Sequence, residues 1–160
     1  MVRDIHECKE IGAHGVVVGV LDEQGLIDKN VMELLIRKAE GMDVTFHRAF
    51  DDLYSLEYAL DTLVNLGVKR VLSSGMARNI EQGMHNLLKM MEYANGRIEI
   101  MVGGGVNTSN LSKLIDTVHP DAVHFSGTTK ERLDENSMFS EIVLKPNRDK
   151  IEHLLACFKD

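Results

Sequence analysis

The chain has 160 residues, of which 44% are hydrophobic, and a formal net charge of −7. This length indicates a single domain with a substantial core, spanning residues 1–160. An acidic chain without a Lys/Arg cluster is disfavoured as a partner of nucleic acid or of an anionic membrane surface, because both require a basic footprint. No run approaches the ~20 apolar residues of a membrane span.

Short apolar runs alternate with helical stretches along the chain. The pattern predicts strands at about 15–21, 43–47, 69–73, 97–103 and 121–125, and helices at 2–11, 29–40, 55–66, 79–94, 109–117 and 147–158. A strand–helix repeat of about 25 residues is typical of βα units on a parallel sheet. Residues 127–146 show no clear period and are predicted to form a long loop.

Residue alternation separates the two faces of each predicted strand. In 43–47 and 121–125, His47 and His124 lie opposite the apolar side chains, and Glu99 lies on the corresponding face of its strand. A sheet buried between two helical layers is apolar on both faces, whereas the inner face of a barrel opens onto a site. The alternation therefore favours a barrel-type sheet over a doubly wound one.

The number of predicted strands falls short of a closed barrel. A (β/α)₈ barrel needs eight strands and about 250 residues. Five strands predict a partial TIM-barrel-like fold with covering helices, whose first three strands are expected to lie before Met1. The inward Glu99 needs a partner, and we expect Arg70, at the matching depth of the preceding strand, to form a structural ion pair with it.

A glycine run follows the fourth predicted strand. Gly103, Gly104 and Gly105 precede a helix, and backbone N–H groups at such a turn can bind an anion. In barrels the loops after the last two strands often hold phosphate, which here are the loops at 103–107 and 126–129. The alternative is a tight turn capped by Thr108 or Ser109.

Two histidines end strands on the predicted inner face. His47 and His124 could act as acid and base, ligate a metal or hold an oxyanion, although each alone is more typical of a satisfied polar core residue. The sequence gives no paired carboxylates, nucleophile elbow, Walker loop or HExxH motif, so whether the protein is an enzyme stays open. The candidate ligand- or anion-binding residues are Arg48, Ser74, Gly75, Gly103, Gly104, Gly105 and Ser126.

Several segments resemble the CutC family of copper homeostasis proteins. The heptad T-F-H-R-A-F-D at 45–51 carries the resemblance, and the segments 15–22, 70–75, 103–106 and 123–126 follow in the family's order and spacing. The resemblance spans residues 1–127. It implies a cytoplasmic, TIM-barrel-like protein that binds copper, often as an oligomer, and it implies no reaction.

The resemblance also implies that a part of the family's barrel is absent here. Its first three strands, with Glu-Leu-Cys and Arg-Pro-Arg-Gly-Gly motifs, would precede Met1. Cu(I) prefers thiolate and thioether ligands, and the family's best candidate cysteine lies in that segment. Cys8 and Cys157 are expected to be reduced thiols on helices away from the lumen. Weak metal candidates are His47, His124 and Met101.

Three hypotheses about function follow. The first is a CutC-type protein in intracellular copper handling. The second is a barrel enzyme acting on a small phosphorylated or carboxylated substrate, with His47 and His124 as the acid–base pair and the loop 103–105 on the anion. The third is a non-functional fragment.

Exposed sheet edges generate a prediction about association. A partial barrel has two unpaired edges, and the inner residues Leu72 and Met101 would face water. At about 25 cal/mol per Å², leaving about 200 Å² of apolar surface open costs about 5 kcal/mol, against a net stability of roughly 5–15 kcal/mol. We predict that the isolated chain aggregates or forms a homo-oligomer that covers the edges. Size-exclusion chromatography with chemical denaturation checks this, and a soluble two-state monomer would contradict it.

Overall fold

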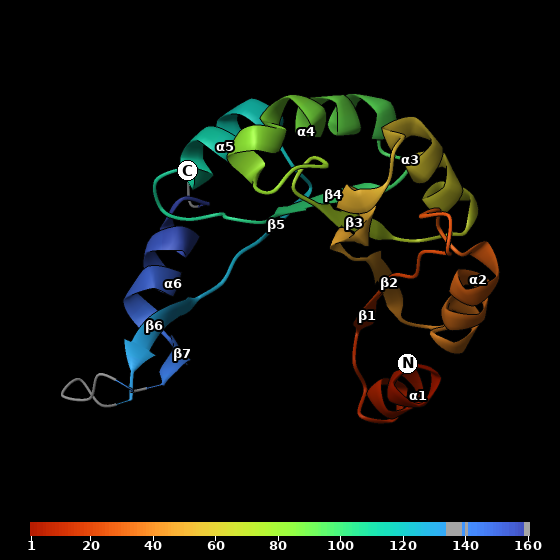
Figure 1. Ribbon diagram of the computed structural model, residues 1–160, viewed down its shortest axis with the longest axis horizontal. Coiled ribbons are helices and arrows are strands. Elements are labelled where there is room, and N and C mark those ends of the chain that lie inside the picture. The colour runs from red at the N-terminus through yellow and green to blue at the C-terminus, as the bar shows by residue number, and fades with distance from the viewer. Residues whose placement is uncertain (134–138, 140, 159–160) are drawn as a thin grey trace.

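Five parallel strands form one open, curved sheet in the order β1-β2-β3-β4-β5 (Figure 1). The computed structural model describes residues 1–133, 139 and 141–158. Every neighbouring pair in this sheet is parallel, as predicted. Strands β1 and β5 are its two edges, so the barrel is not closed. The strands are β1 Gly15–Val18, β2 Asp43–Phe46, β3 Arg70–Ser73, β4 Glu99–Gly103 and β5 Ala122–His124.

Helices connect the strands along the outer side of the arch (Figure 1). Asp28, Ser55 and Asn79 each begin a helix by accepting a backbone N–H with the side-chain oxygen, which satisfies a donor that the first turn leaves free. Among the described residues, no helix is long and apolar enough to traverse a bilayer. The helices are α1 Val2–Glu10, α2 Lys29–Lys38, α3 Leu56–Asn65, α4 Ile80–Ala94, α5 Leu111–Val118 and α6 Arg148–Ala156, with a 3₁₀ helix η1 Arg48–Asp52.

The loop predicted at 127–146 is wrong. Strands β6 Thr128–Arg132 and β7 Ile142–Pro146 pair antiparallel there as a hairpin separate from the main sheet. Most of their side chains are exposed, so no buried face imposes an alternating apolar pattern. Backbone pairing and the exposed Lys145–Glu131 ion pair (2.8 Å) hold the hairpin without leaving a sequence signal.

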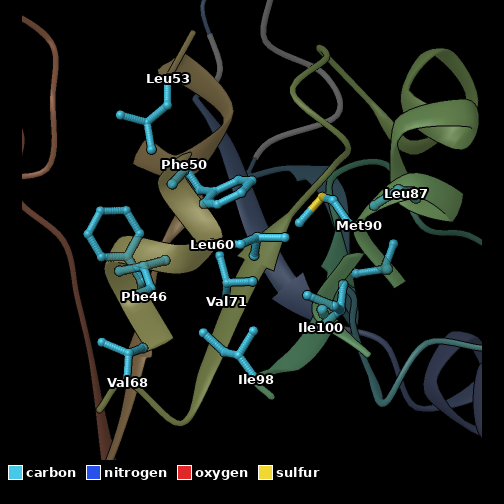
Figure 2. Close-up of a cluster of buried hydrophobic side chains, with 14 of the residues drawn as sticks. Phe46, Phe50, Leu53, Leu60, Val68, Val71, Leu87, Met90, Ile98 and Ile100 are labelled. Carbon is cyan, nitrogen blue, oxygen red and sulfur yellow. The ribbon is translucent and has the colours of Figure 1, made fainter. Parts of the chain in front are cut away.

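The hydrophobic core lies between the sheet and its outer helices. The strand register aligns Phe46 with Val71 and Val71 with Ile100, and all three side chains are fully buried. Leu60 from α3 and Leu87 from α4 are fully buried in the same cluster (Figure 2). The core therefore occupies one face of the sheet only.

The opposite, inner face carries the polar side chains that the alternation predicts. Arg70 and Glu99 are neighbours in register, and Arg70 Nε donates to Glu99 Oε2 at 2.8 Å, which confirms the expected ion pair. Glu99 begins β4 instead of lying in its middle, so the pair sits at the amino-terminal end of the sheet. Leu72 and Met101 are half-buried on this face, and Val17 is 62% exposed.

Helix α4 contacts the end of β3 through backbone. A Cβ atom at Gly83 would lie 1.7 Å from the carbonyl oxygen of Ser74, and one at Gly75 would lie 2.3 Å from that of Gly83. Only glycine fits at this crossing, because the contacted atoms are backbone and cannot rotate away. This contact fixes the loop that follows β3.

The close contact at Gly83 predicts that a larger residue at this position lowers the stability of the fold. Ala is favoured over Gly inside a helix by about 1 kcal/mol, but the clash with Ser74 forces α4 away from the sheet. We expect Gly83→Ala to destabilise the fold by about 1–3 kcal/mol, the usual range for overpacking. Chemical denaturation measures this, with the exposed Gln82→Ala as the control expected to change little. A Gly83→Ala variant that is more stable than the parent would refute the steric argument.

Candidate functional site

A pocket of about 490 Å³ opens at the carboxyl ends of β3, β4 and β5. Apolar walls come from Leu72, Val106 and Phe125. None of the described residues that line it carries a carboxylate. Its polar lining comes from Arg48, Gly104, Gly105, Asn107, His124, Ser126 and Lys150.

Arg48, at the start of η1, is held rigidly beside the pocket. Its Nε donates to Asp51 Oδ2 at 2.7 Å, and its Nη2 donates to the Ser74 hydroxyl and to the Ala77 carbonyl. In the described part of the chain, no hydrogen bond uses Nη1. That nitrogen can therefore donate to a ligand in the pocket without any rearrangement of the side chain.

Asp51 positions Arg48 and joins β2 to β3. Its carboxylate is nearly buried and accepts the backbone N–H groups of Ser74 (3.1 Å) and Met76 (3.0 Å) and the hydroxyl of Ser73. Sequence reasoning quoted Asp51 within the 45–51 heptad but gave it no role. Its spacing of three residues from Arg48, which is typical of a helical ion pair, could have identified it.

The three glycines of the 103–105 run serve different needs. A Cβ at Gly104 (φ +105°) would lie 3.0 Å from Arg48 Nη1, so glycine leaves room for the guanidinium. A Cβ at Gly103 would lie 2.8 Å from Leu72 Cδ1. The register of β4 against β5 directs the N–H of Gly104 to the carbonyl of His124. Within the described residues, no hydrogen bond uses the N–H of Gly105, which remains available to an acceptor.

The far wall of the pocket comes from β5 and from α6. His124 ends β5, is exposed, and is in register with Gly103; the Ser126 hydroxyl lies 2.7 Å from that of Thr128. Lys150 on α6 reaches the pocket and donates through Nζ to the Thr128 carbonyl at 2.9 Å. Sequence reasoning missed Lys150, because a loop predicted at 127–146 gave no reason for α6 to fold back here.

His47 lies outside this pocket. Its Nδ1 accepts the backbone N–H of Ala49 at 3.1 Å, which caps η1 and places the proton of a neutral ring on Nε2. A Cβ at Gly19 would lie 2.6 Å from the ring. His47 lines a second depression beside β1, so the two histidines do not share a pocket.

Other candidate site residues make contacts within the fold instead of lining the pocket. The Ser74 side chain is fully buried in the Arg48–Asp51 network, and Gly75 packs on α4. Met101 is half-buried on the inner face, two residues before Gly103, and does not line the pocket. Cys8, expected away from the lumen, lines the same depression as His47.

The described residues contain no group of three His, Cys, Asp or Glu that could hold a metal ion. The His47 tautomer argues further against a metal there. A metal on Nε2 needs that nitrogen unprotonated, which would place a proton on Nδ1 facing the N–H of Ala49. His124 and Met101 remain as donors on the inner face.

The side chains of Asp61, Tyr93 and Arg97 form a hydrogen-bonded cluster on the outer helical surface. The Tyr93 hydroxyl donates to Asp61 at 2.8 Å and, together with Arg97, lowers the pKa of that carboxyl; the same hydrogen bond raises the pKa of Tyr93. These side chains connect α3 to the end of α4, which is a structural role.

Comparison with known proteins now identifies the family. The model of the CutC family matches residues 1–129. The chain belongs to the CutC family. A CutC family protein of Histophilus somni is 44% identical over 129 residues, and one of Vibrio atlanticus is 40% identical over 145 residues. These matches cover 81% and 89% of this chain.

Solved structures agree with this assignment. A crystal structure of a candidate copper homeostasis protein CutC from Streptococcus agalactiae, 32% identical, superposes with a TM-score of 0.72 over 77% of this chain and 60% of its own. A structure described as native KDPGal, 11% identical, reaches 0.64 and shows the fold alone. The chain spans 53% and 59% of the two CutC relatives, somewhat more than half of their length.

Proposed function

We propose that this chain serves in copper homeostasis and binds copper ions inside the cell. Its CutC family membership supports the proposal, as does the copper homeostasis role by which the S. agalactiae relative is described. Copper is here the cargo of the protein.

Few of the described side chains on the inner face are suitable copper ligands. His124 is in register with Gly103, two residues beyond Met101, so an imidazole nitrogen and a thioether sulfur lie on one face of neighbouring strands. Both are acceptable ligands of Cu(I). Without a thiolate beside them, they support a weak site.

The Cu(I) affinity of this chain is therefore expected to be lower than that of the full-length S. agalactiae CutC, by at least about tenfold, or about 1.4 kcal/mol. Competition with a chromophoric Cu(I) chelator measures both proteins. His124→Ala and Met101→Leu should each weaken binding further, whereas Cys157→Ser, at the residue that caps the end of α6, is the control expected to change nothing. Equal affinities, or loss of binding in Cys157→Ser, would overturn this choice of ligands.

The pocket favours a second function, which is the one that its geometry supports best: binding a small phosphorylated or carboxylated substrate. The observation that carries it is the donor set. Arg48 Nη1, Lys150 and the N–H group of Gly105 line one pocket, and no carboxylate among the described lining residues opposes them. Rigid, charged donors bind anionic oxygens strongly when they need no reorganisation.

If the bound substrate reacts, His124 is the candidate acid or base, because it is the imidazole that lines this pocket. His47 would act differently. With Nδ1 accepting from the Ala49 N–H, its Nε2–H is placed to donate a hydrogen bond. The two histidines would thus have separate roles instead of forming an interchangeable pair.

Lys150 provides the test of the anion site, because its removal spares the Arg48–Asp51 network. Isothermal titration calorimetry with inorganic phosphate at low ionic strength should show binding to the parent chain. Lys150→Ala should weaken this binding about five- to tenfold, or by about 1–1.4 kcal/mol. The matched control is Lys38→Ala, which removes an exposed lysine on α2. Equal losses in the two variants would mean that only net charge matters, and the site would be refuted.

A further inference from the structure

The donors of the pocket at the ends of β3, β4 and β5 form two separate groups. In the first, Arg48 reaches the end of β4, where a Cβ at Gly104 would lie 3.0 Å from Nη1, and its Nη2 donates to the Ala77 carbonyl after β3. In the second, Lys150 Nζ donates to the Thr128 carbonyl at 2.9 Å. Strand β5 lies between these contacts, because Figure 1 shows β6 and α6 beyond β5 on the side away from β4.

The distance between the two groups exceeds what one small anion covers. Neighbouring strands lie about 4.8 Å apart, so the ends of β3 and β5 are about 10 Å apart. Thr128, which holds Lys150, lies four residues beyond the end of β5. A single phosphate that accepts from nitrogens on opposite sides bridges only about 8 Å, since each hydrogen bond is about 2.8 Å long. The pocket therefore has two anion subsites instead of one.

The subsite at β4 suits a carboxylate. The Gly104 carbonyl accepts the N–H of Ile80 at 3.0 Å, and the Gly105 N–H belongs to the same trans peptide, so it points away from α4. Together with Arg48 Nη1 it gives two donors for the two oxygens of a carboxylate. Asp51 already offsets the charge of the guanidinium, which favours a ligand group with a single charge.

The subsite beyond β5 suits a phosphate. Among the described residues, no ion pair includes Lys150, so within that part of the chain no carboxylate offsets its charge. The hydroxyls of Ser126 and Thr128 lie 2.7 Å apart and share one proton, which leaves the other to donate to a ligand. A phosphate monoester, with a charge of about −1.5 to −2 and three acceptor oxygens, gains most from such a cation.

We propose that the pocket binds small acids that carry a carboxylate at one end and a phosphate at the other, joined by about three carbons. The proposal rests on the anion-binding function above and names its substrate class. In a three-carbon acid the two groups are about 5 Å apart, and one hydrogen bond at each end extends the span to about 10 Å. The apolar side chains of Leu72, Val106 and Phe125 line the pocket and would contact the carbons. His124, which ends β5, lies between the two subsites.

A matched pair of ligands tests the carboxylate subsite. Isothermal titration calorimetry compares 3-phosphoglycerate with glycerol 3-phosphate, which keeps the phosphate and the carbon chain but has an alcohol in place of the carboxylate. We expect the parent chain to bind 3-phosphoglycerate at least tenfold more tightly. Arg48→Lys keeps the charge but loses the planar fork, and should abolish this preference. Lys150→Ala should weaken the binding of both ligands by the same factor.

The outcomes separate this substrate class from the anion site itself. Equal affinities of the parent chain for the two ligands, both lowered by Lys150→Ala, would overturn the carboxylate subsite and leave the anion-binding function intact. A preference for 3-phosphoglycerate that persists in Arg48→Lys would also refute the assignment. No binding of either ligand or of inorganic phosphate would overturn both proposals. The comparison on the parent chain needs no variant, so it decides the matter even where Arg48→Lys does not fold.

Discussion

The buried carboxylate of Asp51 is the interaction on which the site depends. It accepts backbone N–H groups of the loop after β3 and the Nε–H of Arg48 after β2, so one side chain joins two strand ends. A charge removed from water is tolerated only when donors surround it, and here they do. The position of the guanidinium beside Gly104 follows from that anchor.

Glycine contacts complete this arrangement. Gly83 lets α4 approach the Ser74 carbonyl, and Gly104 leaves space for Arg48. The Gly83 contact is with backbone, and the Gly104 contact is with the guanidinium of Arg48, which Asp51 holds in place. The pocket wall is therefore rigid. A rigid wall suits a ligand recognised by a few oriented hydrogen bonds, as a small anion is.

The sequence predicts the main sheet well and the hairpin badly, for one reason. Strands β3 and β4 bury alternate residues over most of their length, so alternation and spacing show in their residues. The exposed strands 128–132 and 142–146 bury almost nothing and leave no pattern. The same limit hid Lys150, which reaches the pocket only because that hairpin turns the chain back. The ring orientation of His47 depends on one contact with Ala49, which no residue spacing encodes.

The placement of Lys150 has a consequence for how the ligand preference of the pocket can change. The family match ends at residue 129, whereas this cation stands on α6, tethered by the Asn147 N–H to the Gly127 carbonyl at 2.8 Å. The barrel part supplies Arg48 and the glycine loop, and a separate appendage supplies the second positive charge. Exchange of that appendage would retune ligand preference without disturbing the scaffold.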